Sequence, residues 1–311
     1  MKKILSIDGG GIRGIIPSMI LSDIEKKVGK PVGECFDLIA GTSTGGILAL
    51  GLSKSNADGK PMYSAGKLAE IYSKRGREIF SRSFWKGVSS VGGLTDELYP
   101  ADGLERLLDE YFGSDVLGDC LVNTIVTSYD IQNRAPVFLK SWRKKHSNVL
   151  MKDAARATSA APTYFEPALV NIEGEDKALI DGGVFINSPS VSAFAEAIRI
   201  FPKETDFFVL SLGTGKQTRP ITYKEAKNWG KAEWMLPVMS CMFDGVSDAA
   251  DYQMKKLLGK SYIRLQTDLT IASDDMDNAS NGNVENLKQE AEKLIFKHKK
   301  DLNRLYETLQ K

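Results

Sequence analysis

The hydrophobic pattern of this chain alternates between short apolar runs and longer segments with apolar residues at helical spacing. The short runs predict buried strands at residues 4–7, 36–40, 124–130, 137–141, 178–180, 207–212 and 263–266. The longer segments predict helices at residues 15–28, 47–52, 64–80, 103–111, 150–158, 189–200 and 284–309. The repeated succession of strand, glycine turn and helix indicates an α/β fold, in which helices cover both faces of a parallel sheet.

Two segments lack either pattern and are expected to be loops. Residues 81–100 are rich in serine and glycine, and residues 272–283 are rich in aspartate and asparagine. We find no internal repeat and no linker long enough to mark a domain boundary. Because 311 residues can bury a large core, we expect a single domain over residues 1–311.

The composition is ordinary for a globular protein, with 42% apolar residues and a net charge of +1, so no global field favours nucleic acid. The three cysteines are far apart, which predicts no disulfide framework and suits a reducing compartment. The apolar run at the N-terminus is too short for a signal peptide, and no run approaches the ~20 residues of a membrane span. We therefore expect a cytoplasmic protein that touches membranes only peripherally.

The segment from Gly41 to Gly45 has the pattern Gly-x-Ser-x-Gly and lies between a predicted strand and a predicted helix. In that position Ser43 would project its hydroxyl into a cleft, and the flanking glycines would let the backbone pack closely. The N-terminus of the following helix favours developing negative charge. Ser43 is therefore the candidate nucleophile; the alternative is a glycine-rich turn whose serine caps the helix.

The segment from Gly9 to Gly14 has the pattern Gly-x-Gly-x-x-Gly after a predicted strand. A dinucleotide site would need an acidic residue at the end of the next strand, but Asp37 lies at its start. We expect an oxyanion hole instead, in which each backbone donor contributes about 3 kcal/mol. The candidate donors are Gly9, Gly10, Gly11 and Ile12. Arg13 and Gly14 are candidate substrate contacts, with Arg13 on a phosphate head group or, alternatively, on the surface.

A serine nucleophile needs a base, and the chain has only two histidines. His146 and His298 both lie among basic residues and look solvated, although His298 follows Asp181 in the chain order of a hydrolase triad. Asp181 follows a predicted strand and could accept the serine proton directly. Gly182 and Gly183 would allow this turn to approach the nucleophile, and the alternative is a plain Asp-Gly hairpin turn.

Together these three motifs, and the segment from Ala154 to Phe165, resemble the patatin-like phospholipase family, in its bacterial type. The resemblance covers a core of residues 2–215 and, more weakly, a C-terminal elaboration of residues 216–311. It implies a three-layer α/β/α fold with a mostly parallel sheet and a Ser43–Asp181 dyad without histidine. It further implies oxyanion donors at Gly10 and Gly11, no metal and no cofactor. The implied reaction is release of fatty acids from membrane phospholipids or galactolipids. Residues 186–189 read Ile-Asn-Ser-Pro where relatives commonly have Asn-Asn-Pro.

Two further functions remain open at this point. The first is a catalytically silent module that binds a lipid or a nucleotide through the same glycine loops. The second rests on analogy: some bacterial patatin-like proteins of similar size act in anti-phage defence and are activated by cyclic dinucleotides. The oligomeric state is open as well.

Two apolar segments could serve the substrate. Residues 78–99 mix aromatic and basic residues, which suits a membrane surface, or else form a helix packed on the core and a loop. Residues 229–243 contain tryptophans and methionines that could line an acyl-chain tunnel or pack in the core.

Overall fold

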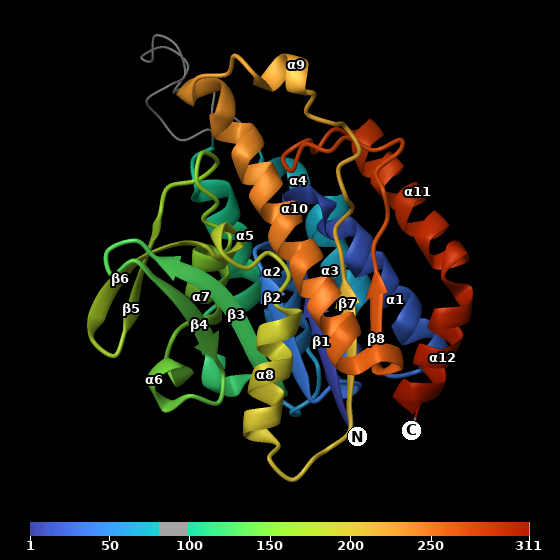
Figure 1. The fold of residues 1–311 in the computed structure, drawn as a ribbon. Helices are drawn as coiled ribbons and strands as arrows, with labels where there is room; N and C mark the ends of the chain where they lie inside the picture. Colours follow the sequence, from blue (N-terminus) through green and yellow to red (C-terminus); the bar gives the residue numbers. More distant parts are fainter. Residues whose placement is uncertain (81–98, 311) are drawn as a thin grey trace.

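The structure is a computed structural model that describes residues 1–80 and 99–310. At its centre lies an eight-stranded sheet with the order β5-β6-β3-β2-β1-β7-β8, and β4 pairs with β3 outside that order (Figure 1). The strands are β1 (Lys2–Ile7), β2 (Leu38–Thr42), β3 (Asn123–Asp130), β4 (Ala135–Lys140), β5 (Ala168–Ile172), β6 (Glu175–Asp181), β7 (Phe207–Leu212) and β8 (Tyr262–Leu265).

The sheet has a parallel part and an antiparallel part. Strands β3, β2, β1, β7 and β8 run parallel to one another, whereas β4 and β6 run antiparallel to β3, and β5 runs antiparallel to β6. The parallel strands carry the apolar runs of the sequence because both of their faces are covered.

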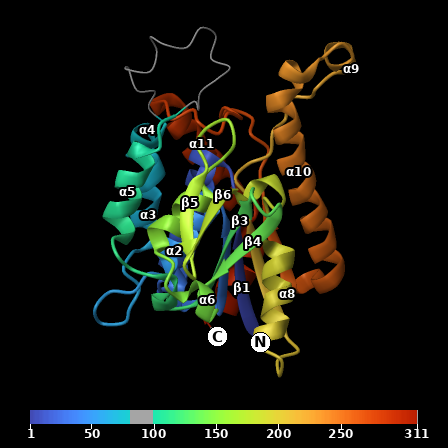
Figure 2. The same cartoon turned by 90° about the vertical axis from the view of Figure 1, so that its left-hand side faces the viewer.

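Neighbouring residues of each parallel strand enter two different cores. Leu5 and Ile39 belong to the larger core, whereas their neighbours Ile4 and Leu38 belong to the smaller one. The larger core is shared by α1 (Ile15–Val28), α2 (Thr44–Ser53), α3 (Ala65–Ser73), α5 (Asp102–Phe112), α7 (Met151–Thr158), α11 (Asn281–Lys297) and α12 (Lys299–Gln310). The smaller core is covered by α8 (Ser190–Ile200) and α10 (Lys231–Leu258). Figure 2 shows the sheet between α8 and α10 on one side and α2, α3 and α5 on the other, so the three-layer α/β/α prediction is confirmed.

Most of the predicted elements are present, but two predicted helices are divided and several elements were not predicted. Residues 64–80 form α3 and the short α4 (Gly76–Ile79), and residues 284–309 are divided between α11 and α12 at His298. Strand β5 and helix α10 were not predicted. β5 buries only every second residue, and the first half of α10 has no buried stripe that would mark it as a helix in the sequence. The short helices α6 (Lys144–Ser147) and α9 (Tyr223–Ala226) complete the fold.

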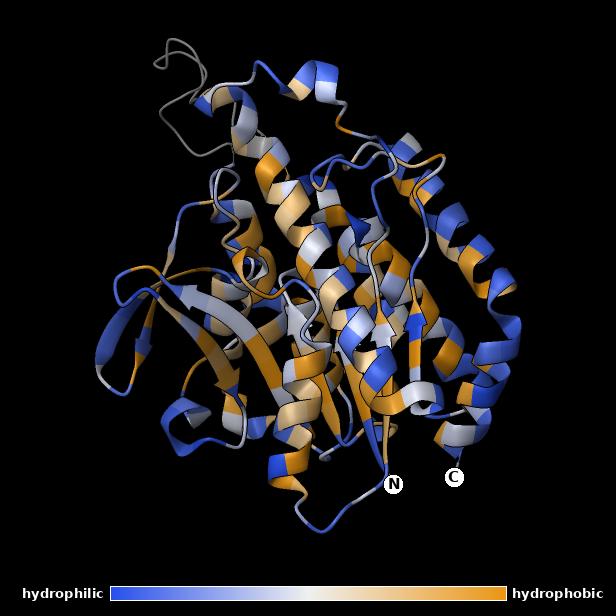
Figure 3. Ribbon diagram, viewed as in Figure 1, coloured by the Kyte–Doolittle hydropathy of each residue, from blue (hydrophilic) through white to orange (hydrophobic). Residues whose placement is uncertain are grey.

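Of the two predicted loops, residues 272–280 form no helix or strand, and the other loop falls largely on residues 81–98, outside the described residues. Figure 3 shows hydrophobic residues concentrated in the strands and hydrophilic turns alternating with hydrophobic ones along α11. Within residues 1–80 and 99–310, none of the helices combines the length and the apolar character required to cross a bilayer.

Candidate active site

Ser43 occupies the tight turn between β2 and α2. Its backbone has φ 55° and ψ −124°, a conformation that costs a non-glycine residue roughly 1–3 kcal/mol. A Cβ atom on Gly41 would lie 2.0 Å from the carbonyl oxygen of Gly45, and one on Gly45 would lie 2.2 Å from that of Ile7. Both positions therefore require glycine. Ser43 makes no side-chain capping bond to α2, so the turn is not explained by a helix cap.

The turn that carries Asp181 meets the serine turn end to end. Along one edge of β3, Thr127 pairs with Thr42 of β2, and the next residue, Ser128, pairs with Asp181 of β6. The other edge of β3 is occupied by β4. Strands β2 and β6 therefore approach head-on along the same edge, because β6 runs antiparallel to β3. This arrangement places the last residue of β6 next to the nucleophile, although the two residues are far apart in sequence.

Asp181 is buried, with 2% of its surface exposed. The carboxylate accepts a hydrogen bond from the Gly183 N–H at 2.7 Å, and the Ser43 hydroxyl lies near enough to lower its pKa. Burial raises the pKa of Asp181 to about 7, against these two groups, which lower it. A Cβ on Gly182 would lie 2.2 Å from Oγ1 of Thr127, so glycine is needed for this turn to pack against β3. The turn is a short 3₁₀ helix rather than a hairpin.

The backbone donors of the first glycine loop fall into two groups. The Gly9 N–H donates to the carbonyl of Asn187 at 3.2 Å, and the Ile12 N–H donates to the carbonyl of Met276 at 2.8 Å. The N–H groups of Gly10 and Gly11 have no acceptor among the described residues, and both glycines line the same cavity as Ser43. Of the four candidate oxyanion donors, only Gly10 and Gly11 are therefore available in this geometry.

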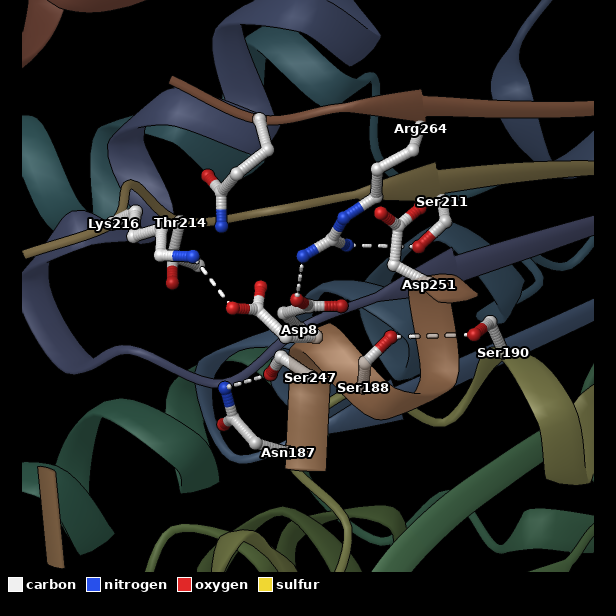
Figure 4. Close-up of polar contacts among 12 residues, drawn as sticks. Asp8, Asn187, Ser188, Ser190, Ser211, Thr214, Lys216, Ser247, Asp251 and Arg264 are labelled. Atoms are coloured by element: carbon white, nitrogen blue, oxygen red, sulfur yellow. Dashed lines mark hydrogen bonds and ion pairs between the residues drawn. The ribbon is translucent and has the colours of Figure 1, made fainter. Parts of the chain in front are cut away.

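A buried polar network contacts the glycine loop and the residue that precedes it, Asp8 (Figure 4). Arg264 of β8 donates to Asp8 at 2.6 Å and to Ser211 at 2.8 Å, and the Thr214 hydroxyl donates to the Gly9 carbonyl at 2.7 Å. Burial raises the pKa of Asp8, whereas Arg264 opposes this shift. Arg264 and Thr214 were not predicted as site residues; the only sequence signal was a charged residue inside the apolar run at 263–266.

Asn187 joins this network from the turn where the sequence departs from the family pattern. Its carbonyl holds the Gly9 N–H, and its side-chain amide donates to Ser247 of α10 at 3.1 Å. Asn187 also lines the cavity. The departure in sequence therefore leaves an asparagine in contact with the glycine loop.

Arg13 and Gly14 have structural contacts and do not line the cavity. Arg13 is only 6% exposed, which excludes the surface alternative, and its Nε donates to the carbonyl of Gly10 at 3.3 Å. Burial lowers the pKa of the Arg13 guanidinium. A Cβ on Gly14 would lie 2.3 Å from Oγ1 of Thr44. Both residues therefore fix the glycine loop against its neighbours.

Ser43 and Asp181 line the same cavity. Its walls are largely apolar, and many of them belong to the larger core or pack against it; they include Ile47, Tyr72, Ile79, Phe80, Leu104, Ala161, Tyr164, Phe165, Phe243 and Met276. Of the segment 229–243, Phe243 lines the cavity, whereas Trp234, Met235 and Met242 are exposed, so core packing is wrong for these three residues. Of the segment 78–99, Ile79 and Phe80 line the cavity, and residues 81–98 lie outside the described residues.

Both histidines lie among the described residues, and neither lines the cavity. His146 is buried rather than solvated: its Nδ1 accepts the Lys140 N–H at 3.1 Å, and burial lowers its pKa to about 4. His298 ends α11 and contacts Asp301 at 3.3 Å. Neither ring is placed to act as a base for Ser43.

Comparison with known proteins shows which proteins this chain resembles. A family model described as patatin-like phospholipase matches residues 5–194. Patatin-like protein 2 of Oryza sativa subsp. indica is 32% identical over 96% of this chain and 84% of the rice protein. Patatin-08 of Solanum tuberosum is 31% identical over 96% of this chain and 84% of the potato protein. Among solved structures, VipD from Legionella pneumophila aligns with 96% of this chain and 67% of its own, with a TM-score of 0.43 and 12% identity.

Proposed function

Because this chain belongs to the patatin-like phospholipase family, a family of lipid acyl hydrolases, we propose that it is a serine esterase with a Ser43–Asp181 dyad. Its substrates would be fatty-acyl esters of membrane phospholipids or galactolipids, cleaved as by a phospholipase A or lysophospholipase. The observation that supports the dyad most directly is that Ser43 and Asp181 line one apolar cavity, where the Ser43 hydroxyl lies near enough to the carboxylate to lower its pKa.

In the acylation step, Asp181 takes the proton of the Ser43 hydroxyl while Oγ attacks the ester carbonyl carbon. The carbonyl oxygen becomes an oxyanion that the free N–H groups of Gly10 and Gly11 can stabilise. When the tetrahedral intermediate collapses, the C–O bond to the lipid alcohol breaks, and the alcohol leaves with the proton from Asp181. The fatty acyl group remains on Ser43 as an ester.

In the second step Asp181 takes a proton from water, and the resulting hydroxide attacks the acyl-enzyme. Collapse releases the fatty acid and returns the proton to Ser43. A base acts best when its pKa lies near the working pH, and burial gives Asp181 a pKa of about 7. Burial therefore supplies the basicity that a histidine provides in other serine hydrolases.

The walls of the cavity favour an acyl chain over a polar substrate. Apolar side chains, many of them from the larger core, surround Ser43, and transfer of each methylene of a fatty acid into such a site contributes about 0.8 kcal/mol. Phe243 is placed beside the base, since a Cβ on Gly183 would lie 2.9 Å from its ring. The fatty acyl chain would thus be bound by hydrophobic contacts, while its ester group lies at the glycine loop.

The direct test is release of fatty acids from phospholipid and galactolipid vesicles by the unaltered chain, Ser43→Ala and Asp181→Asn. Removal of one member of a nucleophile–base pair lowers the rate by at least about 10³-fold, and we expect this loss for both variants. Ser114→Ala and Asp58→Asn are matched controls, because both residues are exposed and lie outside the cavity. Full activity in Ser43→Ala would exclude Ser43 as the nucleophile.

The same experiment tests the two other predictions, a catalytically silent binding module and an enzyme activated by a cyclic dinucleotide. A silent binding module would bind lipid and release no fatty acid from any vesicle. Activation by a cyclic dinucleotide, and with it the role in anti-phage defence, remains a prediction by analogy. It is tested when cyclic dinucleotides are added to the assay, where an activator raises the rate of the unaltered chain and not that of Ser43→Ala.

A further inference from the structure

The first turns of α10 leave the body of the protein. From Lys231 to Met242 no described side chain of α10 is buried, whereas from Phe243 onward a buried residue recurs every three or four positions. Figures 1 and 2 show this end of α10, with α9 beyond it, standing past the sheet. The protruding part begins at the residue where α10 stops contributing to the cavity.

The protruding part carries exposed apolar residues. On α10, Trp234, Met235 and Val238 are exposed, with 46% of Met235 accessible. In the segment that precedes α10, Ile221 is exposed, and Tyr223 of α9 is 84% exposed. Large exposed apolar groups gathered at one place indicate an interaction site, and tryptophan and tyrosine favour the boundary between water and lipid.

The same part carries three lysines without acidic partners. Lys224, Lys227 and Lys231 are exposed and form no ion pair with any described residue. The two nearby acids are engaged locally, because Glu225 accepts from the Thr222 hydroxyl and Glu233 accepts from the Gly230 N–H. Among the described residues, therefore, none neutralises the positive charge of these lysines, and it is available to an anion.

We propose that this region docks the protein on lipid bilayers that contain anionic lipid. We define the α9–α10 surface as Ile221, Tyr223, Lys224, Lys227, Lys231, Trp234, Met235 and Val238. Apolar residues beside lysines match a bilayer surface, where each lysine gains attraction from anionic head groups and each aromatic ring enters the interface. This inference rests on the proposed function, because it gives the cavity access to its lipid.

The position of the surface along α10 supports a bilayer as the partner. Trp234 and Phe243 lie on the same helix, about 14 Å apart along its axis, so lipid at the surface is close to the cavity. A second copy of the chain fits less well. In a symmetric dimer the same patch meets itself, and this would bring the unpaired lysines of both copies together.

The test measures binding of the full chain with the Ser43→Ala change to sedimented vesicles, so that no lipid is consumed. One set of vesicles contains phosphatidylcholine alone, and in the other phosphatidylglycerol replaces about a third of it. We expect Lys224→Glu/Lys227→Glu/Lys231→Glu to bind the anionic vesicles at least about 100-fold more weakly. Trp234→Ala should bind about tenfold more weakly through loss of apolar contact.

Matched control variants carry the same change in charge, or the same loss of an aromatic ring, at other exposed positions. Lys27→Glu/Lys30→Glu/Lys300→Glu alters the net charge equally at exposed lysines elsewhere, and Phe296→Ala removes another exposed aromatic ring. We expect both controls to bind as the parent does. Circular dichroism shows that each variant is folded before its binding is compared.

Three results would overturn the docking surface. The first is equal loss of binding in both lysine variants, which would indicate attraction without a defined site. The second is unchanged binding in the Lys224, Lys227 and Lys231 variant and in Trp234→Ala. The third is an oligomer that Trp234→Ala dissociates, which would make the surface a protein interface. A chain that binds anionic vesicles through these residues but hydrolyses no ester would retain the docking surface and lose the proposed function.

Discussion

The glycine-loop site and the α9–α10 surface lie on the same molecule and treat their charged groups in opposite ways. At the site, Asp8 and Arg264 are buried and bonded to each other at 2.6 Å, and Asp181 accepts a hydrogen bond from the Gly183 N–H. At the α9–α10 surface, lysines and aromatic rings are exposed, and the lysines have no acidic partner among the described residues. At the site, the charged groups are bound to one another and fix the geometry of the glycine loop. At the α9–α10 surface, the charged groups remain available to bind a partner.

This difference teaches how each region should respond to mutation. A buried charge that loses its partner has no water to replace it, so a change at the site should reduce stability or rate. An exposed lysine is already solvated, so its loss should leave the fold intact. Changes at the site should therefore affect stability or rate, whereas changes at the α9–α10 surface should affect lipid binding.

The largest effect is expected for Arg264→Met, which leaves the Asp8 carboxylate buried without its cation. Removing one partner of a buried ion pair costs about 3–5 kcal/mol, and we expect this loss in the free energy of unfolding in urea. Lys231→Met at the α9–α10 surface should change the free energy of unfolding by less than about 0.5 kcal/mol. Asp8→Asn/Arg264→Met should recover much of the stability, and a double variant as unstable as Arg264→Met would contradict the pairing.

The next effect is expected for Gly10→Ala, which alters the oxyanion loop. A Cβ on Gly10 would lie 2.3 Å from Oγ1 of Thr214, a buried residue that already donates to Gly9, so the loop must shift. Displaced donors should lower kcat by about 10²–10³-fold and leave KM less affected. Gly245→Ala in α10 is the comparison, since a Cβ there meets no atom within 4 Å. Equal activity of the two variants would remove Gly10 from the oxyanion hole.

Asp181 should also reduce stability, as a consequence of its burial. Its folded pKa of about 7 exceeds that of the unfolded chain, so the folded state binds more protons between about pH 4 and 7. In that window this group makes the free energy of unfolding fall as pH rises. Asp181→Asn should therefore be more stable than the unaltered chain at pH 8, by ~4 kcal/mol, and about equal near pH 4. Urea unfolding at both pH values, with Asp58→Asn as control, checks the sign.

The same pKa predicts the pH profile of the reaction. Only the ionised Asp181 can take the Ser43 proton, so kcat/KM for a soluble ester should fall about tenfold for each pH unit below 7. Above pH 7 the rate should level off. A midpoint near pH 4 would show that burial does not raise the pKa of the base in solution, and the proposed basicity of the dyad would be lost with it.

The parts of the fold that sequence predicts are those set by neighbouring residues. The glycine at position 41 is explained locally, because the carbonyl of Gly45, a few residues on, leaves no room for a Cβ. The strands of the parallel part were identifiable because two covered faces require continuous apolar runs. Helix α10 was missed because its first turns are apolar on an exposed face, a pattern that fits an external partner rather than the core.

The parts of the site that sequence does not reveal depend on distant pairing. Arg264 holds Asp8 across 256 positions, and nothing near either residue specifies the other. The approach of Asp181 to Ser43 required β6 to run antiparallel and meet β2 end to end, and strand direction is not encoded in a local apolar run. The family resemblance supplied the pairing of Ser43 and Asp181 that local pattern could not.

The smallest effect is expected for His298→Ala, and it decides between a dyad and a triad. His298 ends α11, its ring has a polar contact with Asp301 at 3.3 Å, and it does not line the cavity. We expect stability within about 0.5 kcal/mol of the unaltered chain and an unchanged rate of fatty-acid release. A loss comparable to that of Asp181→Asn would restore the triad, because only a histidine that reaches Ser43 could produce it. Since His146 is buried with its Nδ1 already accepting a backbone N–H, an unchanged rate leaves Asp181 as the base.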